Sequence, residues 1–328
     1  MLADVLRYLC CALCGSELAA VGGALRCAAG HSFDVARQGY VNMLGGARAP
    51  GTADTPEMVR ARAEFLAAGH YAPLAERVAA TARSAVQDVG TGIGPGTGTD
   101  VDAGIRGGIA GDIKEDLGRE VEREAGREVG KDVEGCVLDL GAGTGYHLSR
   151  VLDELPRHVG VALDISKHAA RRAARAHPRV GAVVADTWRR LPVRTETAVL
   201  AINIFAPRNA GEIHRVLRPE GSLVVVTPSP RHLAEIVVPL GLLQVDEEKE
   251  RRMDDQFARG FVLETRQEYE YGFTPTPDDV LRLVGMGPSA WHADTAAVRS
   301  RIERAAPPST VTASFVLSVY RRKDRGGR

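Results

Sequence analysis

The sequence lacks the features that would place the protein in a membrane or outside the cell. It has no apolar run of about 18 residues, the length that begins to suggest a membrane span, and its start has neither a basic segment nor the apolar core of a secretory signal. Only five cysteines are present, and four of them lie within the first 27 residues. This is a poor disulfide framework for 328 residues, so we expect a cytoplasmic protein, with no membrane partner, whose cysteines bind metal.

The sequence also lacks net charge. Lys and Arg number 42, as do Asp and Glu, which excludes a histone-like polycation. The balance is uneven, because residues 136–328 hold 28 basic and 23 acidic residues whereas residues 83–135 hold 7 basic and 12 acidic ones. Lysine is scarce, at 5 of the 42 basic residues, and arginine binds phosphate in a bidentate geometry that lysine cannot adopt. The basic C-terminal region is therefore compatible with a nucleic-acid substrate.

Composition divides the chain into four segments. The first holds the cysteines, the second has the apolar spacing of helices, the third is rich in glycine and charge, and the fourth alternates strands with helices. The third has too few apolar residues to fold and predicts a disordered linker, with a nascent helix near 113–130. In chain order the four segments are residues 1–45, 46–84, 85–135 and 136–328.

Local signals predict the secondary structure of the second and fourth segments. Thr55 is placed to cap a helix that begins at Pro56, and Gly69 divides this helix from the next. The fourth segment predicts a parallel, doubly wound α/β sheet, because strands and helices alternate at short spacing. A late strand at 312–322 is expected at an antiparallel edge. The other expected strands are 137–140, 159–164, 181–186, 197–205 and 222–228, and the expected helices are 146–155, 166–176, 208–217, 230–237 and 278–285.

A cluster of cysteine and histidine predicts a zinc site. Cys11 and Cys14 form a Cys-x-x-Cys pair, and Cys27 is followed four residues later by His31. Three thiolates and one imidazole make the closed ligand set of a structural zinc site, which would stabilise a segment too small to build a core of its own. One alternative is a register that uses Cys10 in place of Cys11, and another is that the cysteines are free or buried.

A glycine-rich loop follows the first strand of the fourth segment. Gly141, Gly143 and Gly145 alternate with other residues after Asp139, and a helix is expected to follow. Glycine lets a ligand approach the backbone closely, and the amino end of a helix favours negative charge. The second strand ends in Asp164, which we place at the two ribose hydroxyls of a nucleoside.

The third strand ends in Asp186, which we expect to accept a hydrogen bond from an adenine amino group. Asp164 and Asp186 would instead cap the next helices in a purely structural interpretation. The GxGxG spacing differs from the GxGxxG of dinucleotide enzymes. Together with Asp139, and with Pro219 and Gly221 before a strand, it resembles class I (Rossmann-like) S-adenosylmethionine-dependent methyltransferases. The resemblance implies that α/β fold, here joined to a small N-terminal zinc-ribbon-like domain.

Outside residues 85–135, nearly the whole chain resembles a narrower family. The cysteine cluster leads into HSFD (31–34) and GYVN (39–42), and FLAAGHYAPL (65–74) and TPSPRHL (227–233) follow. With the glycine loop, these motifs are similar to those of the zinc-containing 23S ribosomal RNA guanine-N1 methyltransferases, which include the tylosin-type macrolide-resistance enzymes.

The resemblance implies the cofactors and several site residues. The cofactors are S-adenosyl-L-methionine and one structural zinc ion per chain. The family's donor contacts fall on Tyr71, Gly143, Thr144 and His232, beside Gly141, so the helical connector that carries Tyr71 contributes to the cofactor site. In the alternative interpretation Tyr71 only packs between helix and sheet, and His232 caps the helix that follows it.

The activity implied is methylation of an unpaired guanine in a hairpin loop of 23S rRNA near the peptide tunnel, with macrolide resistance as its consequence. N1 lies on the Watson–Crick edge, so the base must be unpaired or flipped out. We place Asn203 near the guanine edge, and Phe205 either on the base or in the core. No catalytic base is identified: His232 and Asp186 are conceivable, but both are better used on the donor.

Two other functions remain compatible with the sequence. The fold hosts many acceptors, so a small-molecule methyltransferase is one, although the zinc cluster argues against it. A non-enzymatic zinc-ribbon RNA-binding protein with a decayed methyltransferase domain is the other, although the intact glycine loop argues against decay. The family resemblance also implies a homodimer.

Overall fold

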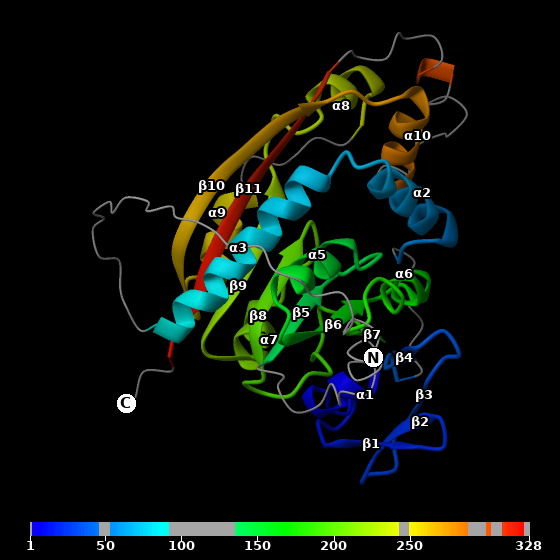
Figure 1. The fold of residues 1–328 in the computed structure, drawn as a ribbon, viewed down its shortest axis with the longest axis vertical. Coiled ribbons are helices and arrows are strands. Elements are labelled where there is room, and N and C mark those ends of the chain that lie inside the picture. Colours follow the sequence, from blue (N-terminus) through cyan, green and yellow to red (C-terminus); the bar gives the residue numbers. More distant parts are fainter. Residues whose placement is uncertain are drawn as a thin grey trace, which may run out of the picture.

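An eight-stranded sheet forms the centre of the structure, a computed structural model that describes residues 2–45, 53–91, 135–242, 249–287, 300–302 and 310–324 (Figure 1). The strand order is β10-β11-β9-β8-β5-β6-β7-β4. The strands are β4 (Tyr40–Asn42), β5 (Gly135–Leu140), β6 (His158–Asp164), β7 (Val180–Val184), β8 (Ala198–Ile204), β9 (Leu217–Pro228), β10 (Phe261–Phe273) and β11 (Val311–Arg322). Most of the expected linker, including 113–130, lies outside the described residues.

Helices cover both faces of the sheet. One face packs against α3, α5, α6 and α8, and the other against α1, α7 and α9, in two separate hydrophobic clusters. The strands from β9 to β4 run parallel, which confirms the predicted doubly wound sheet. The helices are α1 (Leu2–Val5), α2 (Pro56–Ala67), α3 (Ala72–Thr91), α5 (Tyr146–Glu154), α6 (Lys167–Ala173), α7 (Ala210–Val216), α8 (Ala234–Leu240), α9 (Lys249–Phe257) and α10 (Pro277–Met286).

The strand order reverses beside β5, and this reversal places the site. The chain proceeds from β5 to β6 and β7 on one side and then crosses to β8 on the other. Ligands of such sheets bind in the crevice outside the carboxyl ends of the strands at this point. The glycine loop after β5 lies there, as do the residues that follow β6 and β8.

The start of α2 follows the predicted capping pattern. The Thr55 hydroxyl accepts a hydrogen bond from the Met58 amide, and Pro56 occupies the first turn, where its missing N–H costs nothing. Gly69 separates α2 from α3 with a φ of +83°, a left-handed conformation that favours glycine.

The end of α3 differs from the prediction. The helix continues to Thr91, so the boundary expected at residue 84 lies too early. Ala85 is buried in the core, Val86 packs against it, and the Ala85 carbonyl accepts a hydrogen bond from the Ser222 hydroxyl. Contacts with a distant strand therefore extend the helix into a segment whose composition predicts a linker.

The antiparallel edge also differs from the prediction. β11 is antiparallel as expected, but it lies between β9 and β10 rather than at the edge. The edge strand is β10, for which the sequence analysis predicted no strand. Charged residues dominate its middle, and most of its side chains are at least partly exposed, so it lacks the alternation of apolar residues that signals a half-buried strand.

The N-terminal segment is joined to the main sheet rather than separate from it. Its own small sheet contains β1 (Leu18–Val21), β2 (Ala24–Cys27) and β3 (Ser32–Asp34). The next strand, β4, pairs in parallel with β7 and forms the edge of the central sheet, visible in blue in Figure 1. In addition, Val5 of α1 packs on Gly181 of β7. Among the described helices, none is long and apolar enough to cross a membrane.

Gly181→Ala should destabilise the protein, because an added Cβ would lie 2.1 Å from Cγ2 of Val5. We expect a loss of about 1–3 kcal/mol in the free energy of unfolding, as in other overpacked cores. Gly211→Ala in α7 is the control, since its Cβ meets only Oδ1 of Asn209 at 3.8 Å and alanine favours a helix. Urea unfolding compares the two, and equal stabilities would contradict the close packing of α1 on β7.

Candidate cofactor and metal sites

The four predicted zinc ligands lie together in the structure. Nδ1 of His31 is 3.5 Å from Sγ of Cys11 and 3.4 Å from Sγ of Cys27, and the Sγ atoms of Cys14 and Cys27 are 3.7 Å apart. All four ligand atoms lie within 4.8 Å of one another. A tetrahedral zinc ion, with bonds of ~2.3 Å to sulfur and ~2.0–2.1 Å to nitrogen, requires ligand separations of roughly 3.5–3.8 Å. The donor set and its geometry therefore fit structural zinc.

Cys10 is excluded from this cluster. Its side chain is buried, and its backbone amide donates to the Pro192 carbonyl at 3.1 Å, so the register that uses Cys11 is the one observed. The same contact holds the cluster against the main domain. The Arg190 side chain lies directly against Gly15, and Arg194 forms an ion pair with Glu17. The metal cluster is thus docked on the segment that follows β7.

Asp164 connects the glycine loop to the end of β6. Its Oδ2 accepts a hydrogen bond from the Gly143 amide at 2.8 Å, and its Oδ1 accepts one from the Ser166 amide at 2.8 Å. Burial raises the pKa of this carboxyl group, while the two amide donors oppose the rise. Gly141 packs closely against Ala206, because a Cβ at position 141 would lie 2.4 Å from Cβ of Ala206. The loop is therefore held tightly, with its glycines at close contacts.

A second buried carboxylate lies behind the loop. Asp139, near the end of β5, is 3% exposed, and burial together with the charge of Asp164 raises its pKa to about 8. Asp139 is therefore mostly protonated at neutral pH, and the pair carries less than two negative charges.

Tyr71 and His232, which are 161 residues apart in the sequence, lie in direct contact. The Tyr71 hydroxyl is 3.1 Å from Nε2 of His232. Phe65 and Phe315 pack edge-on against the Tyr71 ring, at centroid distances of 5.1 and 5.5 Å. Phe205 stacks on the His232 ring with an interplanar angle of 27°. The structure thus brings two predicted donor contacts into one aromatic wall.

His232 is neutral and already hydrogen bonded. Burial lowers its pKa to about 4, and its Nδ1 accepts a hydrogen bond from the Ser314 amide at 3.2 Å. Nε2 therefore carries the proton and donates to Tyr71, which leaves no free lone pair for a catalytic base. His232 does not cap a helix from 230, because α8 begins at Ala234 after Leu233, whose φ is +58°.

The structure does not support the prediction that Asn203 lies at the guanine edge. It is completely buried, and its amide donates to the carbonyls of Leu140 and Pro207 at 3.3 and 2.9 Å. Its Oδ1 accepts from Nε of Arg208 at 3.0 Å. The Asn203 amide thus ties the loop after β8 to the end of β5, and both of its N–H groups are already used within the protein.

Phe205, by contrast, is partly exposed. Its side chain is 41% exposed and its φ is +56°, a conformation that a non-glycine residue rarely adopts and that costs about 1–3 kcal/mol. The prediction left Phe205 either on the base or in the core. The ring stacks on His232 and packs against Phe315 at a centroid distance of 5.6 Å, while part of it remains exposed.

Asp186 follows β7 and holds a turn. Its Oδ1 accepts a hydrogen bond from the Trp188 amide at 3.0 Å, and its Oδ2 is 3.3 Å from Arg189. Trp188, which the sequence analysis did not select, is 64% exposed. The sequence signal that could have identified Trp188 is its position in a polar loop, two residues after Asp186.

Arg62 and Asp54, also not selected, lie over the glycine loop. They form an ion pair, and the Arg62 guanidinium donates to the Met286 carbonyl at 3.0 Å. A Cβ on Gly143 would lie 3.4 Å from Nη1 of Arg62. The Ser166 hydroxyl donates to the Asp54 carbonyl at 2.7 Å. No motif marks this pair, since contacts between α2, α6 and α10 place it.

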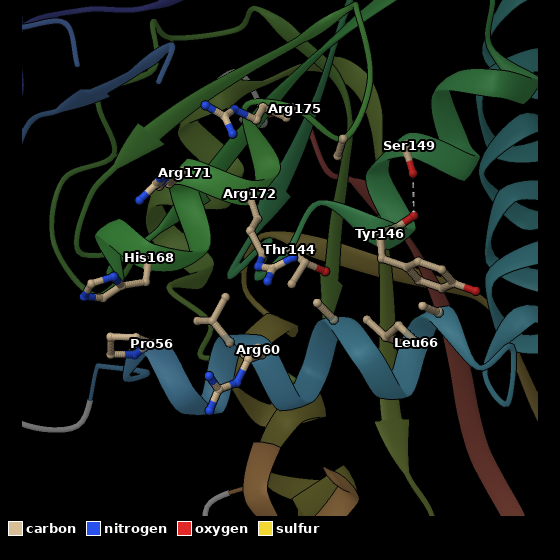
Figure 2. Close-up of a pocket in the computed structure, with 14 residues that line it drawn as sticks. Pro56, Arg60, Leu66, Thr144, Tyr146, Ser149, His168, Arg171, Arg172 and Arg175 are labelled. Carbon is tan, nitrogen blue, oxygen red and sulfur yellow. Dashed lines mark hydrogen bonds between the residues drawn. The ribbon is translucent and has the colours of Figure 1, made fainter. Parts of the chain in front are cut away.

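A pocket of about 800 Å³ lies beside the loop, between α2, the start of α5 and α6 (Figure 2). Of the predicted donor residues, it includes Thr144 alone. Gly141, Gly143, Asp164 and the Tyr71–His232 pair lie outside its lining. The pocket therefore lies beside the predicted donor residues and shares only Thr144 with them.

Two family models match separate parts of the chain. Residues 9–46 match the family model for the N-terminal zinc ribbon of RlmA, and residues 137–221 match a methyltransferase domain. The N-terminal segment is therefore a zinc ribbon, and the sheet is a class I methyltransferase fold.

Curated relatives match almost the whole chain. A protein of Micromonospora griseorubida, assigned as a 23S rRNA (guanine-N(1)-)-methyltransferase, is 47% identical over 97% of this chain and 98% of its own length. The 23S rRNA (guanine(748)-N(1))-methyltransferase of Streptomyces fradiae is 43% identical over 97% of this chain and 98% of its own length. The Bacillus subtilis protein YxjB is 27% identical over 69% of this chain and 66% of its own length.

Cys14→Ser should lose zinc, because a hydroxyl is a much weaker zinc ligand than a thiolate. Metal analysis of the purified variant should give well under one zinc per chain. Cys10→Ser is the matched control and should keep one zinc, since Cys10 lies outside the cluster. Full zinc retention by Cys14→Ser would contradict the ligand assignment.

Asp139 should make stability depend on pH. Its folded pKa of about 8 lies above the ordinary ~3.9, so the folded state holds an extra proton between these values. The free energy of unfolding should therefore fall as pH rises from about 4 to 8, by at most ~1.4 kcal/mol per pH unit. Asp139→Asn should flatten this decline in urea unfolding, whereas Asp153→Asn, at an exposed carboxylate, should not. Parallel declines in all three proteins would refute the assignment.

Proposed function

The chain belongs to the 23S rRNA (guanine-N(1)-)-methyltransferase family, and from this premise we propose that it methylates N1 of an unpaired guanine in a 23S rRNA hairpin loop near the peptide tunnel. Its cofactors are S-adenosyl-L-methionine and a structural zinc ion. The observation that carries the proposal is the Asp164–Gly143 contact at the reversal of strand order, on the same chain as a zinc ribbon.

The donor site is proposed to follow the strand ends. When bound, S-adenosyl-L-methionine supplies an electrophilic methyl group on a sulfonium. Asp164 retains unused lone pairs on both oxygens and would accept from the ribose hydroxyls, while Asp186 would accept from the adenine amino group. The loop formed by Gly141, Gly143 and Thr144 would lie against the amino-acid portion.

Tyr71 and His232 are proposed to close the other side of this site. Nε2 of His232 donates a hydrogen bond to the Tyr71 hydroxyl oxygen. The hydroxyl proton therefore remains available to donate to an acceptor atom of S-adenosyl-L-methionine. Burial raises the pKa of Tyr71 well above its ordinary value, so this hydroxyl remains protonated. The pair therefore contributes a fixed hydrogen-bond donor within an aromatic wall.

The acceptor is proposed to bind beside Phe205. Its partly exposed aromatic ring suits stacking on a base that has left its helix, which is the usual mode of RNA base recognition. The N1 proton must be lost on methylation, and His232 cannot accept it because Nδ1 is occupied. Catalysis then rests on the alignment of N1 with the methyl group, an effect of positioning.

The names of the relatives support a finer proposal for the target. We propose the guanine equivalent to position 748, which names the Streptomyces fradiae enzyme, and macrolide resistance of the tylosin type as the consequence. We further propose a cytoplasmic enzyme that acts as a homodimer, with residues 1–45 recognising RNA and residues 85–135 serving as a linker.

The function is tested with tritiated S-adenosyl-L-methionine and three acceptors: naked 23S rRNA, assembled large subunits and a small-metabolite extract. The wild-type protein should label naked rRNA at one guanine, which appears as a reverse-transcription stop because N1 methylation blocks pairing. Asp164→Ala should abolish labelling and donor binding by calorimetry, since the loop anchor and ribose acceptor are both lost. Asp153→Ala, at an exposed carboxylate, should retain both.

Other outcomes would contradict the proposal. Labelled metabolites with unlabelled RNA would favour a small-molecule methyltransferase, and RNA binding without any labelling would favour a non-enzymatic protein. Asp164→Asn is a second variant, which keeps the test informative if Asp164→Ala fails to fold. It keeps one acceptor oxygen and should weaken donor binding roughly ten- to hundredfold, as expected for about 1.5–3 kcal/mol from a charged hydrogen bond. Unchanged donor affinity in both variants would overturn the donor assignment.

A further inference from the structure

The pocket beside the glycine loop is lined by arginine (Figure 2). Arg60 extends from α2 on one wall, and Arg171, Arg172 and Arg175 come from α6 and the turn that ends it on the other. All four are exposed. In Figure 2 the Arg172 side chain extends toward Thr144, so positive charge reaches the edge of the predicted donor crevice.

Within the described part of the chain, the guanidinium groups of these arginines are not held by ion pairs. None of the four side chains forms an ion pair or a hydrogen bond with the described residues, whereas the neighbouring Arg62 is paired with Asp54. The described lining contains no carboxylate. Outside this lining, the Glu57 carboxylate interacts electrostatically with Arg60 and His168. Four like charges in one groove repel one another, and an anion would relieve that repulsion.

The methyl donor does not suit this groove. S-adenosyl-L-methionine carries one carboxylate but also an ammonium and a sulfonium, so its net charge is positive. A small anion is also a poor match, because a site for one buries its cationic groups, whereas these four are exposed. Exposed guanidinium groups on two facing walls instead suit a polyanion that passes between them.

We propose that this groove binds the phosphate backbone of the RNA substrate, an inference that rests on the proposed function. Phosphate contacts position a nucleic acid, whereas base contacts specify it. Thr144 belongs both to the groove and to the glycine loop. Phosphates held by Arg171 and Arg172 therefore lie close enough for a neighbouring guanine, once flipped out, to enter the donor crevice.

The test measures RNA binding rather than turnover. The probe is a fluorescent 23S rRNA hairpin that contains the guanine equivalent to 748, and the variant is the double substitution Arg171→Gln/Arg172→Gln. Loss of two phosphate contacts should weaken binding about 25-fold at ~0.1 M salt and reduce the slope of log affinity against log salt by ~1.4. Donor affinity by calorimetry and zinc content should stay at wild-type values.

The matched control is Arg218→Gln/Arg259→Gln, which removes the same charge at the opposite end of the sheet. These residues lie near the start of β9 and before β10, away from the carboxyl ends of the parallel strands. The proposal requires the control to bind RNA nearly as tightly as wild type. Equal weakening in both double variants would overturn it, as would unchanged RNA affinity in Arg171→Gln/Arg172→Gln.

Two further results separate this inference from the proposed function. Loss of donor affinity in Arg171→Gln/Arg172→Gln would assign the groove to the donor and overturn the inference. If wild-type protein bound the hairpin but did not methylate it, the proposed activity would be wrong. The inference about the groove would then still be tested by the difference in RNA affinity between wild type and Arg171→Gln/Arg172→Gln. Arg172→Lys, which keeps the charge, should restore most of the affinity that Arg172→Gln loses, whereas equal losses would argue against a phosphate contact.

Discussion

The hydrogen bonds of the Asp164 carboxylate are the contacts on which the predicted donor site depends. One oxygen holds the glycine loop after β5, and the other holds the turn that leads from β6 into α6. A buried carboxylate without partners is costly, so these two amide donors make its position well determined. These hydrogen bonds also connect the loop before α5 to the turn before α6. Any ribose bound there would meet a carboxylate that is already oriented.

The rest of the site is assembled from residues that are distant in sequence. Tyr71, His232 and Phe315 meet because β11 inserts between β9 and β10 and presents Ser314 and Phe315 to the segment after β9. The Ser314 amide then sets the tautomer of His232, and that tautomer leaves the Tyr71 proton free. The antiparallel strands thus fix the orientation of two side chains that are predicted to contact the methyl donor.

The features that the sequence predicted well are those with local causes. The zinc ligands fall in two short turns, and the glycine loop lies between a strand and the helix it starts, so spacing alone identified both. Thr55 and Pro56 marked a helix start for the same reason. β10, the end of α3 and the role of Asn203 depended instead on tertiary contacts: pairing with β11, packing of Ala85 on the core, and hydrogen bonds to Leu140 and Pro207.

The most direct measurement is a crystal structure of the protein with S-adenosyl-L-homocysteine. The account predicts the ribose hydroxyls within hydrogen-bond distance of Asp164, the adenine amino group at Asp186, and the amino-acid portion against Gly143 and Thr144, with the Tyr71–His232 contact retained. Density for the ligand in the arginine-lined groove, away from Asp164, would contradict it.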